Sequence, residues 1–379
     1  MGPRMSPQRP RAGSRRRPAL RQTEVTNQLV RRIVAGAYGA GERLPTRERL
    51  MAEFDASSIT IQRACDDLID LGLVVARGPL GTFIAARPPH RHRLALVFPS
   101  APLADGTWNR FYRTIDQTTQ QLVLAGDDEL TRWYATIDQP ASASTRTLER
   151  QAQLGLCAGL LFAYNPLRHG ADSPLARAPV PRVGVFSSAI PGISTLVLDH
   201  ADYARRIATR LAERGARRVA VLANSVYLAN HSSSLFAALE ERGLEVRPQW
   251  RLGVDLNHPT QVTAVVRLLF AAWNQETPDA LLITDDNLED AAVAGLMSEG
   301  VRVGDGVLVI AHTNFPRTSP SPLPLLRVGF HAGSLLAAGL DELAAQRRDA
   351  TASARVILIP AHVAGDPGDP LAHHRATST

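Results

Sequence analysis

The 379-residue sequence predicts an α/β protein: a small basic N-terminal domain followed by a larger body of two lobes with parallel sheets. Its length is about two to three times that of one domain. After residue 93, short apolar runs alternate with amphipathic helical patterns, which is typical of βαβ units. Residues 1–93 hold 17 arginines and 8 acidic residues, whereas residues 94–379 hold 25 and 28. The formal charges of +9 and −3 indicate a nucleic-acid-binding module attached to a second unit, although a solvated basic face is an alternative.

The first 21 residues are expected to form a disordered basic arm. They contain seven arginines and no acidic residue. Prolines 3, 7, 10 and 18 interrupt any helix in this stretch. The folded N-terminal domain is therefore expected at residues 22–86.

Helices and a hairpin are expected within residues 22–86. An apolar stripe over Val25–Val34 predicts the first helix. Thr46 can cap a short second helix, and Ser57 or Ser58 can cap a third. Strand-like runs at residues 73–76 and 82–85 flank a glycine-containing turn, which predicts a hairpin.

The third helix has two different faces. Its spacing assigns Ile61, Ala64, Cys65 and Leu68 to the core. Thr60, Gln62 and Arg63 are expected on the outer side of the first turns, and Asp66, Asp67 and Asp70 follow them. Because three acids would repel phosphates, only the amino-terminal half of the helix is expected to approach DNA.

These residues carry a resemblance to a known family. Residues 35–48 read AGAYGAGERLPTRE, and with residues 57–74 and 81–84 they closely resemble the winged helix-turn-helix of the GntR family. The resemblance implies a third helix in the major groove, a wing in the minor groove, and two copies on a roughly palindromic operator. Ser58 and Leu80 stand where the family usually has basic residues. The resemblance and the outer helix face nominate as DNA-binding residues Arg47, Arg49, Ser57, Ser58, Thr60, Gln62, Arg63, Arg77, Gly81 and Thr82. A helical hairpin used only for protein contact is the alternative.

A proline- and histidine-containing stretch, residues 87–93, is expected to be an interdomain linker that cannot continue a helix. The effector body is assigned to residues 94–365 and a flexible tail to residues 366–379. Apolar runs predict strands in the body at residues 94–99, 159–163, 183–186, 195–198, 219–222, 280–283, 307–310 and 356–359. Amphipathic segments 203–214 and 288–299 predict helices between them.

The body resembles the type I periplasmic-binding-protein fold that LacI/GalR-type regulators use as an effector domain. The segments that carry this resemblance are PDALLITDD at 278–286, GVRVGDGVLVI at 300–310 and GARRVAVL at 215–222. The resemblance implies a ligand cleft between two lobes, at the carboxyl ends of the strands. Asp286 and the aromatic Trp108 are expected to line this cleft from opposite lobes.

Candidate cleft residues follow from this resemblance and from the aromatic residues near the first strands. His231 stands near the position of a sugar-clamping arginine, and Thr313, with Asn314 beside it, replaces an aspartate. A sugar ligand is therefore not implied. The ligand-binding candidates are Trp108, Phe111, Tyr164, His231, Asp286 and Asn314, with Trp133 and Tyr134 nearby. For the aromatic residues a core role is the alternative, and His231 can equally be a buried histidine with satisfied hydrogen bonds.

Several function classes are excluded or disfavoured. The chain contains no lysine, which excludes pyridoxal-phosphate and P-loop chemistry. Asp285 and Asp286 are adjacent on a strand end and point apart, and no nucleophile motif accompanies them. Cys65 and Cys157 lack disulfide or zinc-ligand spacing. We expect no enzyme activity, no cofactor and no metal site. There is no apolar run long enough for a membrane span and no secretory signal, so we expect no membrane partner and a cytoplasmic protein.

The sequence thus predicts a homodimeric transcriptional regulator, a repressor, that dimerises mainly through its body. Its partners would be a double-stranded DNA operator and a small-molecule effector, with sugars and related metabolites as one candidate class. Two alternatives stay open. One is a DNA-binding regulator or structural protein whose degenerate cleft binds no ligand, and the other is an enzyme with an accessory DNA-binding module.

Overall fold

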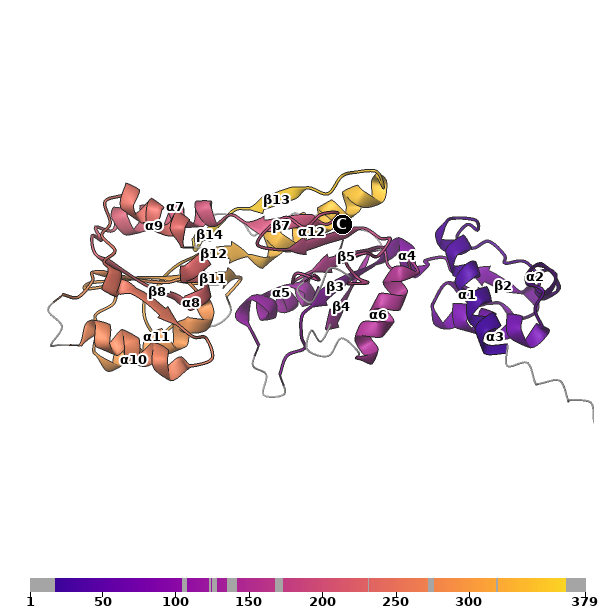
Figure 1. The fold of residues 1–379 in the computed structure, drawn as a ribbon, viewed down its shortest axis with the longest axis horizontal. Helices are drawn as coiled ribbons and strands as arrows, with labels where there is room; N and C mark the ends of the chain where they lie inside the picture. Colours follow the sequence, from indigo (N-terminus) through magenta and orange to yellow (C-terminus); the bar gives the residue numbers. More distant parts are fainter. Residues whose placement is uncertain are drawn as a thin grey trace, which may run out of the picture. The chain divides into compact units, whose positions relative to one another are not determined.

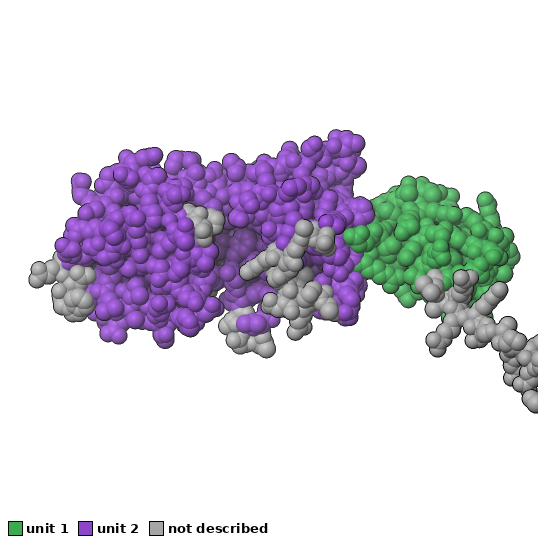
Figure 2. All heavy atoms as spheres, viewed as in Figure 1, with its two compact units in different colours: residues 1–93, 150–158 green, residues 94–149, 159–379 purple. Residues whose placement is uncertain are grey.

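The computed structural model describes residues 18–103, 108–122, 124, 128–134, 142–167, 173–230, 232–271, 276–317 and 320–365. The chain divides into two compact units, shown in Figure 2. Unit 1 comprises residues 1–93 and 150–158, and unit 2 comprises residues 94–149 and 159–379.

Unit 1 contains three helices and a small antiparallel hairpin, as the sequence predicts (Figure 1). In the hairpin, Val74 pairs with Ile84 and Ala76 with Thr82. A one-turn helix follows it. The elements are α1 Pro18–Val34, α2 Arg47–Phe54, α3 Ser58–Asp70, β1 Val74–Ala76, η1 Gly78–Leu80, β2 Thr82–Ile84 and α4 Pro89–His92.

The core of unit 1 is formed by the apolar faces of these helices. Leu29, Ile61 and Leu68 are completely buried, and the hairpin contributes Ile84. Leu156, from the separate segment 150–158, is buried in the same cluster. Burying such aliphatic side chains stabilises a fold by about 1.5–3 kcal/mol each. The periodic apolar pattern therefore accounts for the packing of the small domain.

Two prolines in unit 1 begin helical turns that the sequence did not predict. Helix α1 begins at Pro18, so residues 18–21 of the expected basic arm are helical, and residues 1–17 lie outside the described part of the chain. The expected linker, residues 87–93, contains the one-turn helix α4, which begins at Pro89. Both helical turns have the same reason: a proline in the first helical turn loses no hydrogen bond, because the N–H groups there have no partner within the helix.

Unit 2 is built on two six-stranded sheets with orders β13-β7-β6-β5-β3-β4 and β14-β12-β11-β10-β8-β9. The chain passes between the sheets after β7, β12 and β13, so each lobe combines distant parts of the sequence. Only β14 runs antiparallel to its neighbour among the pairings described in the second sheet. The strands are β3 Arg93–Phe98, β4 Glu129–Tyr134, β5 Gly159–Phe162, β6 Arg182–Val185, β7 Ser194–Leu198, β8 Val219–Asn224, β9 Arg251–Val254, β10 Ala280–Ile283, β11 Leu308–Phe315, β12 Leu326–His331, β13 Val356–Ile359 and β14 His362–Val363.

The apolar runs predicted eight of these strands, with boundaries that agree to within a few residues, but missed β4, β9, β12 and β14. Strand β12 is central but carries Arg327, whose guanidinium pairs with the buried Glu289 and breaks the apolar run. Strands β4, β9 and β14 lie at sheet edges, where burial on both faces is not needed.

Helices cover the sheets of unit 2 (Figure 1). They are α5 Arg110–Gln121, α6 Ala143–Gln153, α7 His200–Glu213, α8 Ser225–Asn230, α9 Ser233–Glu241, α10 Pro259–Phe270, α11 Glu289–Ser298 and α12 Ala332–Arg348, with short turns η2 Pro248–Trp250 and η3 Asp286–Leu288. The last residues of α6, from Arg150, belong to unit 1. Helix α12 packs on β5, β6 and β7. A Cβ atom on its Gly339 would lie 2.9 Å from Leu161, so close packing requires glycine there. None of the helices in the described residues is long and apolar enough to cross a membrane.

Candidate nucleic-acid interface and ligand cleft

The first two turns of α3 expose a small set of side chains. Ser57 caps the helix, because its Oγ accepts a hydrogen bond from the Thr60 N–H at 3.2 Å. Ser58, Ile59 and Arg63 are exposed, and 67% of Ile59 is accessible to solvent. An exposed isoleucine on this turn was not anticipated from the sequence, where only polar residues were considered. The signal that the sequence offered was its position directly after Ser58, in the first turn of the helix.

The expected outward position of Thr60 is wrong. Only 9% of Thr60 is exposed, and its Oγ1 lies 2.9 Å from Ser57 Oγ. The reason is helical geometry: Thr60 precedes the buried Ala64 by one turn and so shares its face. In this conformation Thr60 supports the cap and does not face outward.

The Gln62 side chain of α3 is hydrogen-bonded to residues of both α2 and α3. Arg47 Nη2 donates a hydrogen bond to Gln62 Oε1, and Gln62 Nε2 donates to Asp66 Oδ1 at 2.8 Å. Contact of Gln62 with a base would therefore exchange these bonds for new ones. The nominated residues differ in exposure: Arg47, Arg49, Ser57, Ser58, Arg63 and Arg77 are exposed, and Gln62, Gly81 and Thr82 are half-buried.

The wing tip is apolar as well as basic. Leu80 is 65% exposed, and the Arg77 guanidinium lies over the Phe83 ring at 4.7 Å. Gly81 has φ +102°, and a Cβ atom there would lie 2.9 Å from Arg43 Nε, so only glycine fits this turn without strain. The turn thereby presents Leu80 at its end.

Unit 2 contains two adjoining cavities that share Asp286 and Asn314. The smaller, of about 170 Å³, is lined mainly by aromatic and polar side chains; the larger, of about 320 Å³, is lined by arginines and acids. We call the smaller one the aromatic cavity. Its lining residues are Asn109, Phe111, Leu198, His200, Tyr203, Tyr227, Thr284, Asp285, Asp286, Asn287, His312, Asn314 and Phe330.

Asp286 begins the turn that follows β10 and is 3% exposed. Its Oδ2 accepts hydrogen bonds from Asn314 N at 3.2 Å and Asn314 Nδ2 at 3.0 Å. Its Oδ1 has no hydrogen-bond partner among the residues that the structure describes. A buried carboxylate oxygen without a donor is costly, so this atom is suited to receive one from a ligand.

Tyr203 supplies a second buried polar atom to the same cavity. The residue is 2% exposed, and within the described part of the chain its hydroxyl has no partner. Burial raises the pKa of Tyr203 well above 10, and the nearby Tyr227, Asp285 and Asp286 raise it further. The hydroxyl therefore stays protonated and can donate. The sequence placed Tyr203 only on a helix face, and its approach to Asp286 depends on the fold.

The two lobes are joined beside the cavity by Arg110 of α5. Its backbone N–H donates to Asn287 Oδ1 at 3.0 Å, and its Nη1 donates to the Asp286 carbonyl at 2.6 Å. Its Nη2 pairs with Asp290. One arginine from the first lobe thus bonds the turn of the second lobe that carries Asp286.

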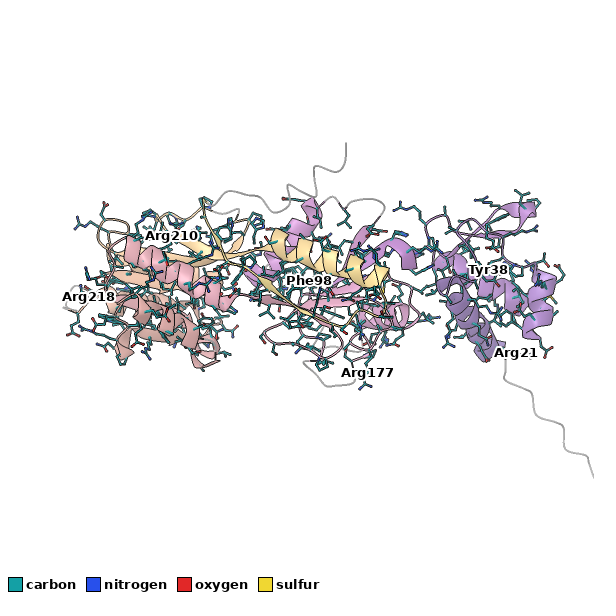
Figure 3. All side chains as sticks on the ribbon, turned by 90° about the horizontal axis from the view of Figure 1, so that it is seen from above. Arg21, Tyr38, Phe98, Arg177, Arg210 and Arg218 are labelled. Carbon is teal, nitrogen blue, oxygen red and sulfur yellow. The ribbon has the colours of Figure 1, made fainter. Side chains whose placement is uncertain are left out.

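The predicted cleft residues are only partly brought together. Phe111, Asp286 and Asn314 line the aromatic cavity. Trp108 instead packs against Phe98, labelled in Figure 3, at a ring distance of 5.1 Å, and donates to Ser100 Oγ at 3.2 Å. Trp108 is therefore not opposite Asp286 as expected. Its indole ring packs in an aromatic cluster and its N–H already has an acceptor there.

The remaining candidates lie apart or outside the described residues. Tyr164 packs edge-on against Phe162, and burial together with Glu149 and Tyr112 raises its pKa to about 12. Tyr134 stacks on Phe98 at 5.6 Å, as part of the cluster that includes Trp108. His231 lies outside the described residues. Within the described ranges no group of three or more metal-ligating side chains is positioned to hold a metal ion.

Comparison with known proteins bears on both units. Residues 21–84 match the family described as bacterial regulatory proteins, gntR family. The chain carries a GntR-type helix-turn-helix domain. The chain is 33% identical over 63 residues to a probable fructoselysine utilization operon transcriptional repressor of Escherichia coli K12, covering 17% of this chain and 26% of that protein. A histidine utilization repressor of Klebsiella aerogenes is 35% identical over 81 residues, covering 21% and 32%. The chain thus spans about a quarter to a third of the length of these relatives.

The body that follows the GntR-type domain has a LacI-like fold. Residues 208–364 match a periplasmic binding protein-like domain. A LacI regulator structure from Bacillus cereus subsp. cytotoxis has a TM-score of 0.55 and 17% identity, covering 72% of this chain and 96% of that one. A LacI-family regulator from Lactobacillus casei with bound glucose has a TM-score of 0.53 and 20% identity, covering 72% and 97%. These similarities establish the fold of the body.

Proposed function

We propose that this protein is a sequence-specific, DNA-binding transcriptional repressor that acts in the cytoplasm as a homodimer. A small molecule bound between the lobes of unit 2 changes its affinity for the operator. The observation that carries the proposal is the exposed face over the first two turns of α3, with Ser58, Ile59 and Arg63, in a GntR-type domain. The named relatives, both repressors, support the direction of regulation.

The charge distribution supports DNA as the partner. Residues 1–93, with a formal charge of +9, include four exposed arginines near or on the outer face of α3 and the wing, at positions 47, 49, 63 and 77. Arginines that neutralise phosphates release counterions, so binding should weaken steeply with salt. The acidic last turns of α3, at Asp66 and Asp70, favour an approach through its first turns.

The cleft supports regulation by a small molecule. Asp286 and Tyr203 come from the second lobe, whereas Phe111 comes from the first, and all three line one cavity. A ligand there would touch both lobes and favour the arrangement that it fits best. Such a ligand shifts the equilibrium only by its difference in affinity for the two arrangements.

The first experiment is selection of binding duplexes from a random pool by the full-length protein, followed by measurement of Kd. We expect Arg63→Ala to weaken binding about tenfold and to lower the salt slope by about one unit. The matched control is Arg210→Ala, a partly exposed arginine on α7 of unit 2 that is labelled in Figure 3. Failure to enrich any sequence, or equal losses in both variants, would contradict the proposal.

The dimer is tested separately. One winged helix reads a half-site, so a palindromic operator requires two copies. Sedimentation of the full chain without DNA should give a dimer at micromolar concentration. A monomer under these conditions would move dimerisation onto the DNA.

A further inference from the structure

We propose that the aromatic cavity binds a small organic ammonium ion, whose N–H group donates to Asp286 Oδ1 while aromatic rings surround its body. This inference names the ligand class of the effector cleft and so rests on the proposed function. It starts from one atom: Asp286 is 3% exposed, and its Oδ1 has no partner in the described residues. A buried carboxylate oxygen without a donor is unfavourable, and a charged N–H donor on a ligand would offset that cost.

The charges of the lining favour a cation. Asp285 and Asp286 both line the cavity, and no arginine does among its described lining residues. Arg110 bonds the Asp286 carbonyl oxygen and lines only the adjoining larger cavity. Arg113 and Arg317 also line that larger cavity, but the Oδ1 atom of Asp286 has no hydrogen-bond partner in the described residues.

The rings favour an ammonium ion over other cations. Phe111 enters from the first lobe, and Tyr203, Tyr227 and Phe330 enter from the second. Tyr203 and Phe330 stack with ring centroids 5.7 Å apart. Aromatic faces attract cations electrostatically, and clusters of rings recognise organic ammonium groups in this way.

Part of the polar lining already forms hydrogen bonds within the protein, which favours a ligand with few polar groups over a polyol. A polyol brings several hydroxyl groups that all need partners once water is removed, whereas an ammonium ion with an apolar body needs few. Four polar lining side chains already bond inside the protein: Asn109 Oδ1 accepts from Phe111 N, Thr284 Oγ1 donates to the Leu222 carbonyl, Asn287 Nδ2 donates to Asp285 Oδ1, and Asn314 Nδ2 donates to Asp286 Oδ2. The Tyr203 hydroxyl remains as a donor for one acceptor on the ligand.

The cavity volume limits the ligand size. At about 170 Å³ the cavity is smaller than the roughly 300–1,000 Å³ of sites for drug-sized molecules. We therefore expect a ligand with few heavy atoms.

The test uses ammonium ions and alcohols of matched shape with the full-length protein. The probes are benzylammonium with benzyl alcohol, isobutylammonium with isobutanol, and glucose as a polyol, with Kd measured by titration calorimetry. We expect at least one ammonium ion to bind about tenfold more tightly than its alcohol, a difference of about 1.4 kcal/mol. The inference would be overturned if, in both pairs, the ammonium ion binds no more tightly than its alcohol or does not bind. Binding of glucose alone would also overturn it.

Two variants locate the site. Asp286→Asn keeps an oxygen for the two Asn314 bonds and removes the charge, so the preference for ammonium should fall below about twofold. The control Asp305→Asn removes the same charge from an exposed turn and should keep the preference. Persistence of the preference in Asp286→Asn would refute the assignment. If that variant does not fold, Phe111→Leu, which removes a ring without changing charge, should weaken benzylammonium more than benzyl alcohol.

A gel shift with the selected duplex separates this inference from the proposed function. If benzylammonium binds through Asp286 but leaves DNA affinity unchanged, the ligand class stands and regulation through this cleft fails. If a neutral ligand changes DNA affinity and no ammonium ion binds, regulation stands and the ligand class fails.

Discussion

Ile59 provides the sharpest test of how this protein reads DNA. The side chain is 67% exposed on the first turn of α3. It follows Ser58, which stands where the family usually has a basic residue. Complete burial of an isoleucine contributes about 1.5–3 kcal/mol, so covering the exposed two-thirds would contribute about 1–2 kcal/mol. That corresponds to about a 5- to 30-fold change in Kd. The natural partner for an apolar side chain in the major groove is the thymine methyl group.

The assay compares Ile59→Ala with the parent by fluorescence anisotropy, on the selected duplex and on a random duplex. We expect a 5- to 30-fold loss on the selected duplex only, by the same estimate of about 1–2 kcal/mol. Deoxyuridine in place of one thymidine removes the methyl group and should reproduce the loss in the parent but add little in Ile59→Ala. Such non-additivity is the signature of direct contact.

The control for this assay is Ile69→Ala. Ile69 lies in the last turn of the same helix and is 37% exposed. Its replacement should leave DNA affinity unchanged. Equal losses on selected and random duplexes for Ile59→Ala, or full additivity with every deoxyuridine position, would refute the reasoning.

Three further predictions concern stability. Glu289 is 1% exposed and pairs with two arginines, so Glu289→Ala should lower the free energy of unfolding in urea by about 3–5 kcal/mol. The control Glu213→Ala, from an exposed pair, should lower it by less than about 1 kcal/mol. Similar losses in both variants would contradict the buried pairing. Trp108 is half-buried in its ring cluster, so Trp108→Ala should lower stability by about 1–3 kcal/mol without changing affinity for benzylammonium. Unchanged thermal stability would return Trp108 to the cleft. Burial, helped by Arg91 and His92, lowers the pKa of His90 from 6.5 to about 4. Between about pH 6.5 and 4 the unfolded chain therefore binds more protons than the folded chain, so the free energy of unfolding should fall as the pH drops through this range. His90→Asn should weaken this pH dependence, measured by urea unfolding at several pH values.

Local chemistry in the sequence determined most of the small domain. Thr46 and Ser57 cap α2 and α3 as the pattern predicts, since the first helical N–H groups need an acceptor that a nearby hydroxyl can supply. Continuous apolar runs likewise predicted the central strands, because parallel strands are buried on both faces. The expected site residues Phe111, Asp286 and Asn314 do meet at one cavity.

Tertiary structure alone decided what surrounds those residues. Tyr203 and Phe111 are far apart in the sequence and belong to different lobes, and no local period reports that they line one cavity with Asp286. The inward position of Thr60 and the ring cluster of Trp108 likewise depend on what packs beside them. A sequence pattern reports which face of an element is apolar, whereas the partner of that face is set by strand order and by the chain's passage between lobes.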